Sequence, residues 1–370
     1  MNNKGLKVLP VLDGGNPQNS TDIICCENGY LIKPIIEDGN PNYMFHLNVL
    51  LENTIDKPLQ GRFIIEWGTE LYQNDRIHLM LYRDKDCWEY FDEVKIDGSR
   101  TIAVGMVPPG ISYLCLHPRY EYKRLLTLAD SLPEDVFTIR VIGKTRMNRD
   151  ILAFESGNPS KIPIAFYCRG HPYETIGSYL IEGMFKWLMK KGNEAEKFLI
   201  DNYCVFVPMP NTDGVADGRN RITHGGLNFS ANFRNSAEPE AVALKAYFAH
   251  KKPSVIFDIH AWNNPWENIV TNDGKMGKAL YKVILANEEL FFRPVEIRYQ
   301  PIAWNIADHS CNYFADELGV SFFNSSWNPH GRTAADFYSM GTILLKAAAK
   351  AANAGSQMLN APFNNRKGTE

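Results

Sequence analysis

Apolar and polar residues alternate along the first third of the chain, and this pattern predicts short β-strands. Phe45, Leu47, Val49 and Leu51 fall on alternate positions, as they do in a strand with one buried face. Further strand-like runs, separated by turn residues, are Arg62–Trp67, Ile77–Tyr82, Thr101–Val107 and Ile111–Leu116. Because no strong helical stretch lies between them, we expect a small antiparallel β-sandwich.

The pattern changes near Pro133, where a second domain is predicted to begin. Tyr120–Leu132 has helical spacing and ends at this proline. Beyond it, strand-like runs alternate with amphipathic helices, which is typical of a mixed or parallel sheet with helices on both faces. The expected strands are Phe137–Ile142, Ile151–Phe154, Ile162–Cys168, Tyr203–Val207, Val255–Ile259 and Val320–Phe323, and the expected helices are Thr175–Lys190, Glu238–Ala249, Met276–Leu290, Asp308–Leu318 and Ala334–Ala352.

These patterns divide the chain into four predicted segments. Residues 1–28 form a polar leader, and residues 29–132 form the N-terminal β-sandwich. Residues 133–360 form the α/β domain, and residues 361–370 form a flexible tail because they are polar and terminal. The candidate chemistry described below falls in the third of these segments.

The composition is that of a soluble globular protein, with 370 residues of which 45% are hydrophobic and 22% charged. The formal net charge of -3 gives no electrostatic support for nucleic acid or an anionic membrane as a partner. No apolar run has the length of a secretory signal or a membrane span, so we expect a cytoplasmic protein. Seven scattered cysteines fit reduced thiols. These features leave the oligomeric state open.

Two residues with metal-binding side chains follow the apolar run Ile162–Cys168. His171 and Glu174 lie in the turn that leads into the helix expected to begin at Thr175. The end of a strand that opens onto a helix is where α/β proteins place their ligands. An imidazole and a carboxylate three positions apart can point at one ion, and zinc accepts both kinds of donor.

A third candidate ligand stands at the end of another expected strand. His260 follows Val255–Ile259 and would emerge at the same carboxyl edge of the sheet. Two histidines and one glutamate leave an open coordination position, which is typical of a catalytic zinc site. Asp258 alternates with His260 along the strand and can orient it by a hydrogen bond. The alternative interpretation is a set of buried polar residues with ordinary hydrogen-bond partners.

The segment Cys168–Thr175 (Cys-Arg-Gly-His-Pro-Tyr-Glu-Thr) resembles the zinc-binding segment of the zinc metallocarboxypeptidases, and most closely that of their cytosolic subgroup. Pro208–Gly214 is similar to the family's Pro-x-x-Asn-Pro-Asp-Gly, and Asp258–His260 is similar to its Asp-x-His. The resemblance implies a zinc-carboxypeptidase-like mixed sheet flanked by helices and preceded by an antiparallel β-sandwich. It also implies one zinc ion (Zn2+) on His171, Glu174 and His260.

The resemblance further implies an arginine that polarises the scissile carbonyl and stabilises the oxyanion. Spacing from Pro208–Gly214 places this arginine at Arg221, with Arg219 as the alternative if the loop is shifted by two residues. Arginine suits the role because a fixed cationic donor needs little reorganisation when negative charge develops. Asn228 matches the family residue that orients the first ligand histidine, which is His171 in this chain.

One departure from the family pattern concerns recognition of the substrate's terminal carboxylate. The family uses an Asn-Arg pair for this contact, and this chain has Ser230 and Ala231 at the two positions. Alanine cannot bind a carboxylate, so the bidentate contact of an arginine is lost. Cleavage of a free C-terminal residue is therefore not expected.

A second departure concerns the general base, which is a glutamate in the family and Ser326 in this chain. A serine hydroxyl does not take a proton from zinc-bound water at neutral pH, and loss of a general base typically costs about 10²–10⁴-fold in rate. Glu267, His330 and Asp336 are candidate replacements. Alternatively, zinc acts as a Lewis acid on an activated ester or amide, or the site binds metal and ligand without turnover.

The expected function is that of a zinc-dependent hydrolase of an amide or related acyl bond, with Arg221 polarising the carbonyl. The substrate would be a small molecule or a modified peptide without a free terminal carboxylate. Trp262, at the start of a loop that ends at Trp266, and Trp327 would line a pocket for a ring or acyl chain, although core packing explains tryptophans equally well. The alternative function is that of a catalytically weakened carboxypeptidase-like protein that serves as a zinc-containing binding module.

Overall fold

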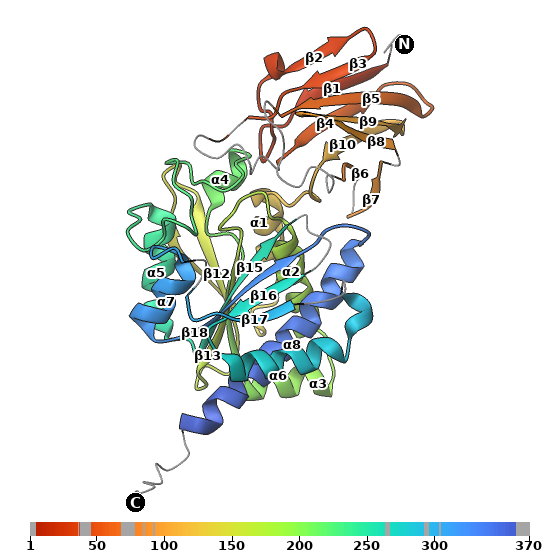
Figure 1. The fold of residues 1–370 in the computed structure, drawn as a ribbon. Helices are drawn as coiled ribbons and strands as arrows, with labels where there is room; N and C mark the ends of the chain where they lie inside the picture. The colour runs from red at the N-terminus through yellow and green to blue at the C-terminus, as the bar shows by residue number, and fades with distance from the viewer. Residues whose placement is uncertain are drawn as a thin grey trace, which may run out of the picture.

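The structure is a computed structural model that describes residues 5–35, 37, 46–67, 78–83, 86–91, 93–262, 267–291, 296–302 and 305–359. Two small β-sheets lie at one end of the molecule, and a larger α/β unit with an eight-stranded sheet forms the rest (Figure 1). Within the described residues, no helix combines the length and the apolar character that crossing a bilayer requires.

Each of the two N-terminal sheets has five strands, in the orders β1-β4-β10-β6-β7 and β2-β3-β5-β9-β8. The strands are β1 (Leu6–Pro10), β2 (Ile23–Cys26), β3 (Gly29–Ile32), β4 (Asn48–Asn53), β5 (Leu59–Glu66), β6 (Met80–Tyr82), β7 (Trp88–Tyr90), β8 (Glu93–Asp97), β9 (Arg100–Val107) and β10 (Gly110–Cys115). Neighbouring strands are antiparallel, as predicted, except for the parallel pair β3 and β5. β3 and β5 can pair in parallel because the chain passes through β4 of the other sheet between them and then returns to the sheet that contains β3.

One apolar core is shared by the two N-terminal sheets. Alternation along β5 buries Phe63 and Ile65, and alternation along β4 buries Val49 and Leu51 of the other sheet in the same cluster. The period of two in the sequence predicted these strands because one face of each strand is buried. The first residues of two predicted strands, Phe45 and Ile77, lie outside the described residues.

Two strands lie in the segment that the sequence assigned to a polar leader. Leu6 and Val8 of β1 are buried in the shared core, and β2 pairs with β3. Both strands are short, so their pattern does not stand out from the polar residues around them. In addition, helix α1 (Tyr122–Ser131) buries Leu125 in the core of the α/β unit, although the sequence grouped it with the N-terminal domain. The boundaries at residues 28 and 132 stay predictions.

The large sheet has the strand order β11-β12-β14-β13-β15-β18-β16-β17. Its strands are β11 (Phe137–Lys144), β12 (Asp150–Gly157), β13 (Pro163–Cys168), β14 (Tyr203–Val207), β15 (Val255–Ala261), β16 (Asn268–Thr271), β17 (Glu296–Tyr299) and β18 (Ser321–Trp327). The four central strands β14, β13, β15 and β18 run parallel, while β12 and β16 are antiparallel to their neighbours β14 and β18. The sheet is therefore mixed, as predicted.

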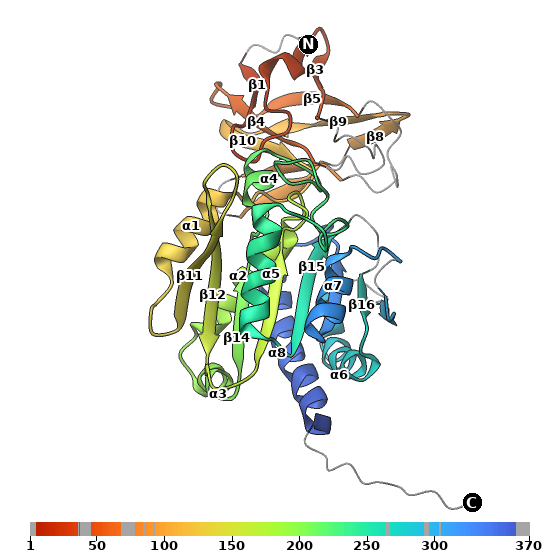
Figure 2. The same cartoon turned by 90° about the vertical axis from the view of Figure 1, so that its left-hand side faces the viewer.

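Helices cover both faces of this sheet (Figure 2). One face packs against α1, α2 (Ile176–Leu188), α3 (Asn193–Asp201), α6 (Gly274–Leu285) and α8 (Ala334–Leu359), and the other against α5 (Pro239–Lys251) and α7 (Ser310–Leu318). The predicted fold class is thus confirmed. The elements α3, α4 (Thr212–Ala216), β16 and β17 were not predicted, because they are short and carry little periodicity.

The N-terminal sheets lie against the carboxyl edge of the large sheet (Figures 1 and 2). Tyr173, in the loop that follows β13, is buried in the core of the N-terminal sheets. The N–H of Gly14 donates a hydrogen bond of 3.0 Å to the carbonyl of Ala216 in α4. Since ligands of α/β sheets bind outside the carboxyl ends of the strands, the N-terminal sheets contact the region where a site is expected.

Candidate metal centre

His171, Glu174 and His260 come from two neighbouring strands of the large sheet. His171 and Glu174 lie in the loop between β13 and α2, and His260 lies in β15. β13 and β15 pair in parallel with Cys168 opposite Ile259, which puts the loop and His260 at the same edge. The chain turns immediately after β13 at Arg169, whose φ of 59° lies in the left-handed region.

The three side chains converge on one point. One donor atom from each lies within 4.8 Å of the other two, and all three residues are buried. Glu174 Oε1 is 3.0 Å from His171 Nδ1, and Glu174 Oε2 is 2.7 Å from His260 Nδ1. Two imidazoles and one carboxylate form a donor set that suits zinc and leaves a coordination position open, so these residues fit that ion.

Asn228 and Asp258 contact the far nitrogens of the two imidazoles. His171 Nε2 is 3.4 Å from Asn228 Oδ1, and His260 Nε2 is 3.0 Å from Asp258 Oδ1. The Asn228 oxygen also accepts a hydrogen bond of 2.9 Å from the N–H of Ala231, which fixes the orientation of its amide. Asn228 is an acceptor for His171 Nε2, and the nearby carboxylate of Asp258 favours a proton on His260 Nε2 through its charge, although these two atoms lack hydrogen-bond geometry. The two Nδ1 atoms are then left as metal donors.

Burial and neighbouring charges set the protonation of the centre. Burial and the charge of Arg221 lower the pKa of His171 to about 4. Burial also disfavours the charged form of His260, but the carboxylates of Asp258 and Glu174 outweigh it and raise the pKa of His260 to about 10. Burial raises the pKa of Glu174, and the two histidines outweigh this effect and hold that pKa well below its usual range. At neutral pH and without metal, His260 is therefore protonated on both ring nitrogens, and it must lose the Nδ1 proton when a metal ion binds.

The loop that carries the candidate arginines is held by the N-terminal part of the chain. Glu37, which follows β3, accepts a hydrogen bond of 2.9 Å from the N–H of Arg221 and a second one from the N–H of Asn220. Arg221 is close enough to the centre to influence the pKa of His171. The alternative candidate, Arg219, has its Nε atom 4.0 Å from an Asp217 oxygen and lines a separate small cavity.

The predicted substrate-binding residues occupy different surroundings. Ser230 is buried, and its hydroxyl has no hydrogen-bond partner among the described residues. Ala231 follows it and contacts Asn228 through its backbone, as described above. Trp262 directly follows β15, and its backbone N–H donates a hydrogen bond of 3.1 Å to the backbone carbonyl of Trp327. The remainder of the loop predicted to line a pocket, residues 263–266, lies outside the described residues.

Ser326 lies beside the candidate ligand His260, since the two residues are opposite each other in the pairing of β15 with β18. The three candidate replacement bases have other contacts. Glu267 is fully buried in an ion pair with Arg332, and His330 packs its ring 3.8 Å from that of His78. Asp336 accepts a hydrogen bond of 2.7 Å from the N–H of Thr333 at the start of α8. These contacts explain each side chain without a catalytic role.

Two residues near the centre were not predicted from the sequence. Glu37 lies 184 positions before the loop that it holds, so no local pattern points to it. His309 is buried at the start of α7, and its Nδ1 accepts a hydrogen bond of 3.2 Å from the N–H of Cys311. Burial lowers the pKa of His309 to about 4, and the charges of Asp258 and His260 also act on it. The expected helix Asp308–Leu318 placed His309 within its first turn, whereas the structure starts α7 at Ser310 and makes His309 its N-cap, so no pattern in the sequence indicated a ligand.

The arrangement of sheet, helices and N-terminal sheets is that of the metallocarboxypeptidases. A metallo-carboxypeptidase from Burkholderia cenocepacia superposes with a TM-score of 0.78 at 17% identity, over 95% of this chain and 100% of that one. For a putative carboxypeptidase A from Shewanella denitrificans the TM-score is 0.76 at 18% identity, over 93% and 98% of the two chains. A metallo-carboxypeptidase from Pseudomonas aeruginosa, in complex with (2-guanidinoethylmercapto)succinic acid, superposes with a TM-score of 0.77 at 16% identity. The match covers 94% of this chain and 99% of that one.

The family model for zinc carboxypeptidases matches residues 122–241. This range contains His171 and Glu174 and ends before His260. Residues 122–241 are therefore similar to a zinc carboxypeptidase domain, and the resemblance found in the sequence is confirmed at that level.

Proposed function

We propose that this protein is a zinc-dependent hydrolase of an amide or related acyl bond, with zinc bound by His171, Glu174 and His260. The observation that carries the proposal is the orientation of the two imidazoles. Asn228 and Asp258 contact the two Nε2 atoms, and both Nδ1 atoms face the carboxylate of Glu174. Ordinary buried histidines need partners, but they do not need to point their remaining nitrogens at one shared carboxylate.

A zinc ion in this centre supplies a Lewis acid that polarises a carbonyl group and acidifies water. The protein's own groups do the rest in this proposal. Arg221, held by Glu37 through its backbone, donates hydrogen bonds to the carbonyl oxygen as negative charge develops there. The buried hydroxyl of Ser230 hydrogen-bonds a polar group of the substrate, and Trp262 contacts its apolar part.

The substrate in this proposal is a small molecule or a modified peptide that lacks a free terminal carboxylate. Ala231 offers only its backbone N–H, and that group already donates to Asn228. The Pseudomonas aeruginosa relative was solved with a small succinic acid derivative, which supports a site open to small molecules. The likeness to the cytosolic subgroup and the seven free cysteines support a cytoplasmic location.

Hydrolysis of matched substrate pairs tests the proposal. Purified protein loaded with zinc is assayed on two substrate pairs. One pair is an acyl-amino acid and its methyl ester, and the other is a peptide with a free C-terminus and the same peptide with an amidated C-terminus. We expect turnover of the ester and of the amidated peptide to exceed that of their free-acid counterparts, and we expect none in protein treated with a chelator. Zinc binding without turnover of any member of the panel would contradict the hydrolase proposal.

Zinc affinity should rise with pH because His260 must lose a proton before Nδ1 can bind the metal. Its pKa of about 10 in the metal-free protein means that the proton is present throughout the neutral range, whereas His171, with a pKa of about 4, is already neutral. We expect the zinc association constant to increase about tenfold per pH unit between about pH 6 and pH 8. Competition with a chromophoric chelator, corrected for the chelator's own protonation, measures this slope.

Calorimetry gives an independent check on that proton. Zinc titrations in buffers of different ionisation enthalpy should report release of about one proton per zinc ion at neutral pH. An association constant that does not change with pH, together with no proton release, would mean that His260 is not a ligand.

Glu37→Gln is expected to lower kcat/KM by about tenfold or more without loss of zinc. One of the two oxygens that accept the N–H groups of Asn220 and Arg221 becomes an NH₂ donor, which repels the N–H that faces it. The loop then no longer holds Arg221 in place, and small displacements of catalytic groups are costly. Steady-state kinetics and metal analysis measure the two effects. Glu134→Gln, at an exposed position, is the matched control, and equal kinetics for both variants would contradict the role of Glu37.

The second candidate function is a zinc-containing binding module. The observation that favours it is the set of contacts made by the candidate bases: Glu267 is paired with Arg332, His330 packs on His78, and Asp336 caps α8. In that case the pocket binds its ligand without turnover, and the effect of Ser326→Glu described in the Discussion separates the two functions.

A further inference from the structure

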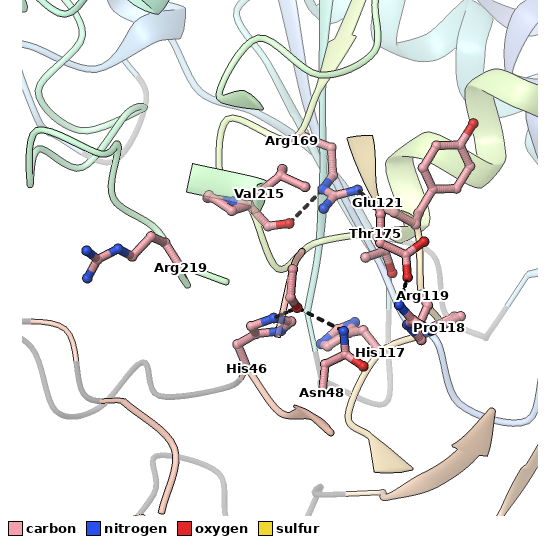
Figure 3. Close-up of a pocket in the computed structure, with 13 residues that line it drawn as sticks. His46, Asn48, His117, Pro118, Arg119, Glu121, Arg169, Thr175, Val215 and Arg219 are labelled. Atoms are coloured by element: carbon pink, nitrogen blue, oxygen red, sulfur yellow. Dashed lines mark hydrogen bonds and ion pairs between the residues drawn. The ribbon is translucent and has the colours of Figure 1, made fainter. Parts of the chain in front are cut away.

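A small cavity lies where the N-terminal sheets meet the loop that carries His171 and Glu174 (Figure 3). His46 and His117 line it from the N-terminal part of the chain, and Arg169 and Thr175 line it from the α/β unit. Its volume of about 20 Å³ is room for about one water-sized atom. None of the three candidate metal ligands lines the cavity, so it is distinct from the candidate metal centre.

Arg169 brings a buried positive charge to this cavity. Only 3% of its surface is exposed. Its hydrogen bonds go to neutral oxygens: the carbonyl of Pro172 at 2.6 Å, the carbonyl of Tyr120 at 2.8 Å and the hydroxyl of Ser178 at 3.2 Å. Among the described residues, no carboxylate forms a salt bridge with it. A buried charge without a counter-ion is costly, so native proteins pair such groups.

The carboxylate that also lines the cavity is engaged elsewhere. Glu121 forms an ion pair with Arg119, so these two charges compensate each other. Arg219 extends away from the other labelled side chains in Figure 3, toward Asp217. Arg169 is therefore the cation of the cavity that has no salt bridge among the described residues, and the carboxylates of Glu121 and Glu174 act on its pKa only from beyond salt-bridge distance.

The same cavity has buried polar groups whose hydrogen-bonding capacity is not used within the described part of the chain. Both ring nitrogens of His117 and the hydroxyl of Thr175 have no partner there. His117 is held by an edge contact of its ring with Tyr173, at 5.2 Å between centroids. Burying such groups without partners costs free energy, and a bound species that accepts hydrogen bonds from the Thr175 hydroxyl and from the single N–H of the neutral His117 ring reduces that cost.

We propose that this cavity binds one small monovalent anion of the chloride class, held by the guanidinium of Arg169 and by hydrogen bonds from Thr175 and His117. The size of the cavity selects the class, because sulfate, phosphate and carboxylates need more room than one atom. A water molecule fits the volume but gives Arg169 no ion-pair partner. The anion joins the N-terminal sheets to the loop between β13 and α2, so its expected effect is on the stability of that junction.

Thermal unfolding of the full-length protein at constant ionic strength tests the site. Sodium chloride replaces sodium gluconate in steps, and sodium bromide and sodium sulfate are run in parallel. Once the chloride or bromide concentration exceeds the dissociation constant of the site, Tm should rise by about 2 °C for each tenfold increase in that concentration. Sulfate and gluconate should not reproduce this rise, because they do not fit the cavity.

Two variants remove the proposed contacts, and one variant controls for loss of charge. Arg169→Met removes the guanidinium, and Thr175→Val removes only a hydroxyl and keeps the shape of the side chain. The dependence of Tm on chloride should disappear in the first and weaken in the second. Lys197→Met, which removes an exposed cation from α3, should show the same dependence of Tm on chloride as the unaltered protein. General salt effects would act on all four proteins alike.

Anomalous diffraction from crystals soaked in bromide gives a readout that does not depend on any variant folding. We expect a bromide peak in the cavity beside Arg169 and Thr175. A peak of ordinary water density without anomalous signal, together with equal Tm curves in chloride and gluconate, would show that the cavity holds water only and would overturn the proposal. Neither result depends on whether the protein hydrolyses a substrate.

Discussion

Glu174→Ala should reduce bound zinc from about one ion per chain to less than a tenth of that amount. The carboxylate lies between the two imidazoles, 3.0 Å and 2.7 Å from their Nδ1 atoms, so its loss removes a ligand and the group that holds the others together. Mutation of residues that merely support ligands already costs about 10–100-fold in metal affinity, and loss of a ligand should cost more. Metal analysis after dialysis against buffer with a weak chelator measures the change.

The same loss is expected for His171→Ala and His260→Ala. His250→Ala, at an exposed position in α5, is the matched control and should retain its zinc. Circular dichroism of each variant separates loss of metal from loss of fold. If all three ligand variants fold and bind zinc as the unaltered protein does, the centre is not a metal site and the proposed hydrolase mechanism fails with it.

Ser326→Glu should raise the rate of amide hydrolysis by about 10²–10⁴-fold, the range that a general base contributes. Ser326 is opposite His260 in the sheet and only 9% exposed, so a carboxylate there would lie beside the candidate zinc centre and out of bulk solvent. The amidated peptide of the substrate panel is the appropriate probe, because the chain lacks the family's carboxylate-binding arginine. Initial rates at saturating zinc measure the gain.

Ser326→Gln is the matched control, since it has the size of glutamate without the ability to accept a proton. If Ser326→Glu gains activity from a baseline of zero, the natural protein is better described as a binding module. If the natural protein hydrolyses esters and the variant also hydrolyses amides, this result supports the hydrolase proposal. Cleavage of peptides with a free C-terminus should stay poor until Ala231→Arg is added. Equal rates for the Glu and Gln variants would show that position 326 does not correspond to the family's base.

Patterns along the chain were enough to predict most strands and helices of the α/β unit and to name the three residues whose side chains converge. Tyr203–Val207 was predicted with the bounds that the structure has, and the strand containing Asp258 and His260 was predicted within two residues of its end. These predictions succeeded because burial imposes a period of two or a continuous apolar run on the residues of one strand, which is a local signal. The positions of His171, Glu174 and His260 followed, since the ends of parallel strands share one edge of a sheet.

The partners of distant groups became known only from the folded chain. Nothing local indicates that Glu37 holds the backbone of Arg221, that Glu267 is paired with Arg332, or that Arg169 lines a cavity without a salt bridge among the described residues. The strands β1 and β2 are a similar case, because their short runs become strands through pairing with β4 and β3. The physical reason is the same throughout: a side chain's charge state and role depend on what packing places within a few ångströms of it, and packing joins residues that are far apart in the chain.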